Sequence, residues 1–178
     1  VYKRQDIKCW DKAQARPWRE VKKYANKDQK IIHIGSLCEL CYLKGSELSG
    51  TQRKFKGRVV FLGDRVRDQH GATAVFEEMS SSPASMEASR FCDAYGCLPG
   101  HIIMQADAEQ AYVQADLTGT ETWIALPEEA WPEDWWVYTR GLDGSTPEAR
   151  AARIGKYKRP VCKLLRALYG HPDAGTMW

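Results

Sequence analysis

The sequence places an aspartate directly after an apolar run and an aromatic residue shortly beyond it. The apolar residues 102–104 lead into Asp107, and Tyr112 stands in a second apolar patch five positions later. A carboxylate at the end of a strand is held rigidly while the loop beyond it opens to substrate. Such a group can bind Mg²⁺, which prefers oxygen ligands. The plain alternatives are a strand-end turn or cap residue for Asp107 and a core aromatic for Tyr112.

Composition indicates an ordinary globular protein, because 43% of its 178 residues are hydrophobic and 28% are charged. The length suits one domain or a large part of one. The six cysteines, with no signal peptide, do not indicate a disulfide framework, so we expect a reduced intracellular setting. No apolar run approaches the ~18 residues of a membrane span. The chain begins at Val1 and stops at Trp178 in mid-pattern, and we interpret it as a piece of a longer polypeptide.

Charge is distributed in three blocks. Residues 1–67 hold 17 Lys and Arg against 7 Asp and Glu, residues 68–149 hold 2 against 15, and residues 150–178 hold 7 against 1. Basic flanks suit phosphate backbones, and an acidic centre suits divalent cations. The alternative is a set of solvated faces whose sign drifts by chance.

The N-terminal third predicts one helix followed by a small antiparallel sheet built from hairpins. Pro17 can occupy the first turn of a helix over residues 15–30, in which Trp18, Val21 and Ala25 recur at helical spacing. Strand-like runs follow at residues 30–35, 37–45 and 54–64, with a turn signal at residues 46–52.

The rest of the chain mixes the two types of element. Residues 80–97 predict a helix with Ser82 as N-cap and Gly96 as its C-terminal stop. Residues 101–107 predict a strand, residues 108–117 a turn or short helix, and residues 121–126 another strand. Residues 131–159 predict a variable surface loop, and order returns at residues 159–170. Without regular βαβ alternation, this pattern indicates an α+β fold.

Three stretches, in order, resemble the reverse transcriptase of copia-type LTR retrotransposon Pol polyproteins. They are KFKGRVVFLG at residues 54–63, QADAEQAYVQADLTG at 105–119 with TWIALP after it, and VCKLLRALYG at 161–170. The resemblance implies antiparallel-sheet fingers with helices packed on an incomplete right-hand polymerase palm. Residues 1–52 would be the N-terminal helix and hairpin of the fingers, residues 53–100 the fingers, and residues 101–178 the first part of the palm.

The resemblance also implies roles for individual residues. Asp107 matches the first catalytic, metal-binding aspartate, and the carbonyl of Ala108 would be a second ligand of Mg²⁺, with Mn²⁺ as an alternative ion. Tyr112 matches the aromatic that packs beneath the incoming sugar and excludes a ribose 2′-hydroxyl. Lys56 and Arg58 match basic positions that meet the nucleotide triphosphate, Arg being suited to bidentate phosphate contact. The alternative for these two is a solvated basic strand edge.

Asp173 departs from the family, because it occupies the place of a glutamine that positions template and nucleotide. An acid close to phosphates is unfavourable unless it is paired or bound to metal. Three explanations stay open: Arg166 or Lys163 offsets the charge, the lineage uses another contact, or the copy has decayed.

No Asp-Asp dipeptide occurs in these 178 residues, whereas the family has one in its second metal motif. The segment would therefore lack the rest of the palm, the thumb and the RNase H domain, and we predict that it does not polymerise alone. The implied partners are an RNA or DNA template–primer, deoxynucleoside triphosphates and the remainder of the Pol polyprotein, including integrase, with no membrane. The implied location is a cytoplasmic virus-like particle with a nuclear stage.

Two other functions compete. Cys38 and Cys41, with His33 upstream and Cys92 and Cys97 downstream, could bind zinc, although one CxxC is half a signature and free cysteine also packs as a small hydrophobe. A module that binds nucleic acid without chemistry could use the basic N-terminal third together with Trp10 and Trp18, since aromatics beside cations bind single strands. That hypothesis leaves Asp107 unexplained.

Overall fold

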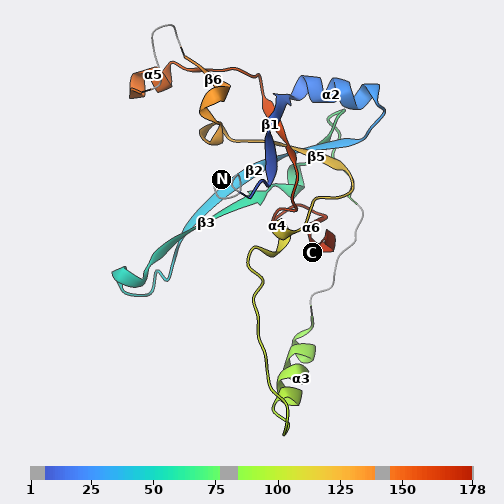
Figure 1. The fold of residues 1–178 in the computed structure, drawn as a ribbon, viewed down its shortest axis with the longest axis vertical. Helices are drawn as coiled ribbons and strands as arrows, with labels where there is room; N and C mark the ends of the chain where they lie inside the picture. Colours follow the sequence, from blue (N-terminus) through green and yellow to red (C-terminus); the bar gives the residue numbers. More distant parts are fainter. Residues whose placement is uncertain (1–6, 77–83, 139–144, 178) are drawn as a thin grey trace.

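A curled, six-stranded mixed sheet shaped like a half-barrel forms the centre of the computed structural model, which describes residues 7–76, 84–138 and 145–177 (Figure 1). Five strands run in the order β1–β8–β5–β2–β3, and β4 pairs with β2 outside this path. Their bounds are β1 Trp10–Pro17, β2 Ile32–Lys44, β3 Lys54–Phe61, β4 Arg67–Asp68, β5 Glu121–Ala125 and β8 Pro160–Leu164. The sheet takes strands from the N-terminal, middle and C-terminal parts of the chain.

Strands β2 and β3 form the predicted hairpin. They pair antiparallel from Lys44 opposite Lys54 to Leu37 opposite Phe61. The two runs predicted at residues 30–35 and 37–45 are one continuous strand, because Ser36 between them does not interrupt the pairing. Beyond the half-barrel the hairpin projects as a long two-stranded arm, with the short 3₁₀ helix η1 (Gly50–Gln52) at its tip (Figure 1).

The small antiparallel sheet predicted for the N-terminal third is confirmed for β2 and β3, and one pair of the larger sheet is parallel. The first half of β2 lies parallel to β5, with Ile32 opposite Glu121 and Ser36 opposite Ala125. Strand β8 closes the other edge of β5 and pairs antiparallel with both β5 and β1. Such long-range partners leave no local sequence signal.

Helix α2 (Trp18–Lys27) confirms the predicted helix, although its start is later than residue 15. Pro17 is both the last residue of β1 and the N-cap of α2, which suits its fixed φ and missing N–H. Val21 and Ala25 are buried against Ile32, Trp123 and Val161. The apolar side of α2 thus covers one face of the sheet.

Helix α3 (Met86–Gly96) confirms the second predicted helix and lies on an arm far from the sheet (Figure 1). Its N-cap is Ser85, whose hydroxyl accepts a hydrogen bond from the Ala88 N–H at 3.2 Å. The predicted cap, Ser82, lies outside the described residues. Gly96 ends the helix as predicted.

The strand predicted at residues 101–107 is wrong. Residues 101–108 have no regular structure, and Ile102 and Met104 expose 81% and 86% of their surface. An isolated apolar run cannot become a strand without a neighbour for its backbone, and no described strand pairs with this one. Ile103 instead packs on Gly96 at the end of α3.

The remaining elements are short. Outside residues 131–159 they are the 3₁₀ helices η2 (Gly63–Arg65) and η3 (Glu128–Ala130) and the helices α4 (Ala111–Gln114) and α6 (Ala174–Met177). The region predicted as a surface loop at residues 131–159 contains the 3₁₀ helix η4 (Glu133–Trp135), the strand pair β6 (Trp136–Val137) and β7 (Ile154–Gly155), and the helix α5 (Pro147–Ala151). Trp135 is buried, and the Trp131 and Trp136 rings lie 4.8 Å apart. Tryptophan packing therefore anchors this region.

The main core contains residues from four strands and the last motif, including Leu37, Phe61, Ile124, Cys162 and Leu168. Glycine is required where Gly35 faces the Phe61 ring, since a β-carbon there would overlap the ring. In the described residues, no helix is long and apolar enough to span a bilayer.

Candidate functional site

The three motif stretches, 54–63, 105–119 and 161–170, meet around one turn. The backbone N–H of Phe61 at the end of β3 donates to the carbonyl of Tyr169 at 2.7 Å. Gly170 has φ +87°, and a β-carbon there would overlap the carbonyl of Phe61. From the other side, the Tyr112 ring on α4 packs edge-on against the Tyr169 ring, with centroids 4.7 Å apart. Stretches more than 40 positions apart in sequence are thus fixed to one another.

A second set of contacts joins the segment after α4 to the last motif. Residues 115–117 and 165–167 are linked by two backbone hydrogen bonds of 2.8 and 3.0 Å. The Arg166 guanidinium contacts the Asp116 carboxylate at 2.9 Å and donates to the Gln114 carbonyl at 3.1 Å. Arg166 therefore serves to hold α4 in place.

Asp107 and Ala108 are not at the end of a rigid strand. Both are exposed on the irregular segment that leads from the α3 arm back to α4. Within residues 7–76, 84–138 and 145–177, no three His, Cys, Asp or Glu side chains are placed to hold a metal ion together. One carboxylate and one carbonyl on an exposed segment do not make a complete Mg²⁺ site, so the residues present do not by themselves fit the ion. The metal role of Asp107 stays a prediction.

Lys56 and Arg58 lie on one face of the hairpin arm. Lys56 is opposite Tyr42, Arg58 is opposite Leu40, and Lys54 is opposite Lys44. Cross-strand partners in a sheet point to the same side. We call the surface formed by Tyr42, Lys44, Lys54, Lys56 and Arg58 the basic face.

The basic face is exposed, and its cations are available. The Arg58 guanidinium lies 5.7 Å from the centre of the Tyr42 ring, a cation–π contact. In the part of the chain that the structure describes, Lys44, Lys54 and Lys56 form no ion pair with a carboxylate. On the opposite face, the half nearer the hairpin tip carries Leu43, Phe55, Cys41 and Gly57 and is apolar.

Asp173 is half-buried just before α6 and lines a cleft of about 390 Å³ with His33, Phe76 and residues 118–120. Burial raises the pKa of its carboxyl, and the nearby His33 opposes this shift. Neither Arg166 nor Lys163 neutralises the Asp173 carboxylate. Arg166 pairs with Asp116, and Lys163 pairs with Glu121 at 3.1 Å. The explanation by Arg166 or Lys163 is therefore wrong.

His171 is a buried residue that the sequence pattern did not identify. Its Nδ1 accepts a hydrogen bond from the Asp173 N–H at 3.2 Å, so Nε2 carries the proton in the neutral ring. Nε2 lies 3.4 Å from the Thr122 hydroxyl, which in turn donates to the Thr120 carbonyl at 3.1 Å. Phe61 and Phe76 enclose the ring.

Burial, together with the smaller effect of the nearby His33, lowers the pKa of His171 to about 4. A neutral histidine thus orients the backbone that presents Asp173. A polar run such as HPDAG is typical of a surface turn, and for that reason the burial of His171 has no signal in the sequence.

The structure separates the predicted site residues into three places. Tyr112 and Asp173 are close to the turn at Tyr169 and Gly170, since Tyr112 contacts Tyr169 and the Asp173 N–H donates to His171. Lys56 and Arg58 lie on the hairpin arm, and Asp107 lies on the exposed segment. In the described ranges no hydrogen bond or ion pair joins Lys56 or Arg58 to Asp107 or Asp173.

The competing hypotheses meet geometric obstacles. Cys38 and Cys41 are three positions apart on one strand, and alternation therefore points their side chains to opposite faces of β2. They cannot bind one zinc ion without breaking the strand. Trp10 is 2% exposed, and Trp18, the first residue of α2, is partly buried against the cluster that contains Val21 and Trp123. Trp10 therefore does not offer a stacking surface for bases.

No protein-family model, curated protein or solved structure matches this chain. What the chain can do chemically is therefore inferred from its own residues and their arrangement.

Proposed function

We propose that this chain forms the fingers and the first part of the palm of a copia-type reverse transcriptase, an RNA-directed DNA polymerase. The observation that carries this proposal is the contact of the three motif stretches around Phe61, Tyr169 and Tyr112. Packing of the three stretches on one another supports the proposal, because motifs that act together in one site need to be held together by the fold.

The proposed reaction is attack of a primer 3′-hydroxyl on the α-phosphate of a deoxynucleotide, with release of pyrophosphate. Such chemistry depends on positioning and on charge stabilisation rather than on covalent help from protein. Arg58 and Lys56 would neutralise the triphosphate or a template phosphate. Tyr112, held by the edge of the Tyr169 ring, would present a fixed surface to the sugar.

Asp107 is the proposed catalytic aspartate, and to bind metal ions it needs further ligands that the described residues do not provide. A two-metal site needs a second carboxylate, which we assign to another part of the Pol polyprotein. Packing of that part on the exposed apolar residues 102–104 would also give the segment before Asp107 a neighbour for its backbone. Isolated from it, the chain is expected to bind nucleic acid without extending a primer.

A second candidate function is nucleic-acid binding without catalysis, as in a decayed or domesticated element. The exposed basic face of the hairpin favours it, because that surface needs no metal and is complete in this chain. The two functions make different predictions for Asp107.

Primer extension distinguishes them. The polyprotein that contains this chain is compared with its Asp107→Asn variant for Mg²⁺-dependent extension, and template binding is measured in parallel by fluorescence anisotropy. Under the polymerase proposal, Asp107→Asn abolishes extension and leaves template binding unchanged. Binding without extension by either protein supports the second function, and absence of both activities overturns the two together.

A further inference from the structure

The outer side of α2 carries a row of three cations. Arg19, Lys23 and Lys27 are spaced four residues apart, so they are neighbours along one side of the helix. At 100° per residue this side points away from Val21 and Ala25, which are buried on the sheet. We call the three residues the α2 stripe.

The three like charges of the α2 stripe destabilise the helix unless an anion neutralises them. Like charges at i, i+4 destabilise a helix by a few tenths of a kcal/mol per pair, and Glu20 is the helix's single acid. In the ranges that the structure describes, none of the three cations is paired with a carboxylate.

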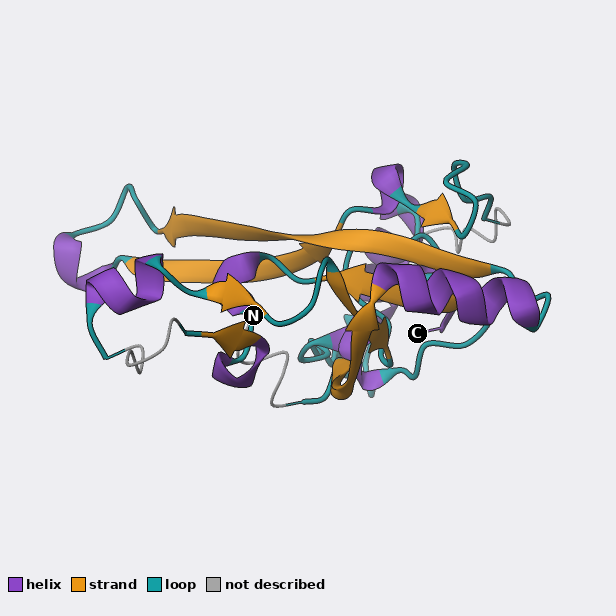
Figure 2. Ribbon diagram, turned by 90° about the horizontal axis from the view of Figure 1, so that it is seen from above, coloured by secondary structure: helices purple, strands orange, loops and turns teal. Residues whose placement is uncertain are grey.

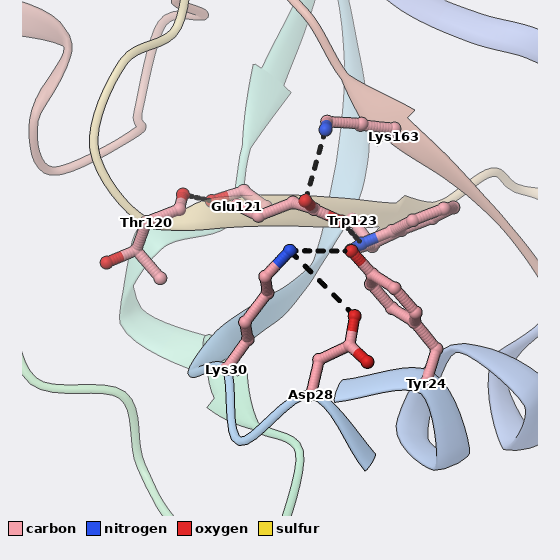
Figure 3. A network of polar contacts seen from close by, with 8 residues as sticks. Tyr24, Asp28, Lys30, Thr120, Glu121, Trp123 and Lys163 are labelled. Carbon is pink, nitrogen blue, oxygen red and sulfur yellow. Dashed lines mark hydrogen bonds and ion pairs between the residues drawn. The ribbon is translucent and has the colours of Figure 1, made fainter. Parts of the chain in front are cut away.

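Other cations around this helix are engaged, as Figure 3 shows. The Lys30 ammonium donates to the Tyr24 hydroxyl at 3.0 Å and lies 3.9 Å from Asp28, and Lys163 contacts Glu121 at 3.1 Å. The Lys30 contact fixes the C-terminal part of α2 to the segment before β2, and the Lys163–Glu121 pair joins β8 to β5. The α2 stripe takes no part in them and is left available on a fixed element.

The α2 stripe and the basic face of the hairpin are related through β2. Ile32 and Ile34 at the start of this strand belong to the cluster beneath α2, and Tyr42 and Lys44 have the same parity at its end. Alternation therefore assigns them to the same face of the strand. A 13-residue strand is about 40 Å long, and Figure 2 shows α2 at one end of it and the hairpin tip at the other.

We propose that the α2 stripe is a second phosphate-contacting surface, used together with the basic face of the hairpin by one nucleic acid molecule. This inference rests on the proposed function and adds a path for the ligand to it. Along β2 the two basic surfaces are about 30–40 Å apart, which is beyond a Debye length, so only an extended polyanion bridges them. A duplex rises about 3.4 Å per base pair, so about 9 to 12 base pairs are needed to reach both.

The test measures affinity and salt dependence for two stem–loop duplexes, of about 8 and about 24 base pairs, by fluorescence anisotropy with the full chain. The α2 variant changes Arg19, Lys23 and Lys27 to Gln. A hairpin variant changes Lys54, Lys56 and Arg58 to Gln. A control of equal charge changes Arg65, Arg150 and Lys158, three exposed cations elsewhere, to Gln.

For the α2 variant we expect the longer duplex to bind at least about tenfold more weakly, with a salt slope smaller by about 2 to 3. The shorter duplex should change about twofold or less, because the basic face still holds it. Equal binding of the longer duplex by the α2 variant and the control overturns the inference.

The hairpin variant separates this inference from the proposed function. If it loses binding of both duplexes while the α2 variant does not differ from the control, the proposed function stands and the second surface is wrong. If the hairpin variant binds both duplexes as the control does, the proposed function fails at its nucleic-acid surface, and the bridging inference fails with it.

Discussion

The backbone of Gly170 lies directly against the carbonyl of Phe61, so that a single β-carbon at Gly170 would overlap it. The contact joins the end of β3 to the last motif, and Gly170 also has a φ of +87°. Two independent reasons therefore demand glycine here: the left-handed backbone and the absence of space.

Gly170→Ala should lower the free energy of unfolding by about 3 kcal/mol or more, since the left-handed conformation costs about 1–2 kcal/mol and the overlap adds a similar amount. Gly119→Ala is the matched control, because Gly119 has φ +81° and open space around it. It should cost only the conformational part. Urea denaturation of both variants measures the difference, and equal losses would mean that the Phe61 contact yields easily.

Acidification should destabilise the fold through His171. Its folded pKa of about 4 lies below its ordinary value of 6.5, so the unfolded chain binds the proton more readily between these values. Stability is complete above about pH 6.5 and is lost as the pH falls towards 4, by about 3 kcal/mol at most. His33, whose pKa is also lowered by burial, acts in the same direction.

Urea midpoints between pH 7.5 and pH 4 measure this loss, with His171→Gln as the comparison. The variant should be less stable at neutral pH and should show a shallower dependence in this window. Asp173 acts oppositely just above its ordinary value, because its raised pKa favours the protonated folded state. An unchanged slope in His171→Gln would show that other groups cause the acid sensitivity.

The parts of the fold that could be predicted are those with a local cause. Helix α2, the β2–β3 hairpin and strand β5 follow from apolar spacing and turn residues, whereas the pattern at residues 159–170 indicates order but not that Pro160–Leu164 is a strand. The prediction of a strand at residues 101–107 is wrong because an apolar run contains no information about which strand would pair with it. The parallel β2–β5 contact and the strand at Trp10–Pro17 also depend on residues more than 80 positions away, which a local window does not contain.

In the candidate site, too, features with a local cause could be predicted and features that depend on distant segments could not. The exposure of Lys56 and Arg58 could be predicted, because a basic strand edge is solvated. The burial of His171 and the pairing of Arg166 with Asp116 could not, because both result from how distant segments pack.

The two faces of the hairpin predict different effects for its two exposed aromatics. Phe55 is 81% exposed and Tyr42 is 41% exposed, so exposure alone would favour Phe55 as the stacking platform for bases. Tyr42, however, shares its face with Lys56 and Arg58, whereas Phe55 points to the apolar face. Tyr42→Ala should therefore weaken binding of a single-stranded oligonucleotide by about 1–3 kcal/mol, and Phe55→Ala should change it little. A larger effect of Phe55→Ala, measured by anisotropy, would place the strand on the other face.

The packing of Tyr112 on Tyr169 predicts that sugar selection depends on both rings. Tyr112→Val removes the aromatic surface, and the polyprotein with this change should incorporate ribonucleotides more readily relative to deoxynucleotides. Tyr169→Leu keeps Tyr112 but removes the ring that positions it at 4.7 Å, so it should give a weaker effect in the same direction. Single-nucleotide incorporation with matched ribo- and deoxynucleotides measures the ratio. A loss of total activity with an unchanged ratio would instead assign Tyr112 a structural role.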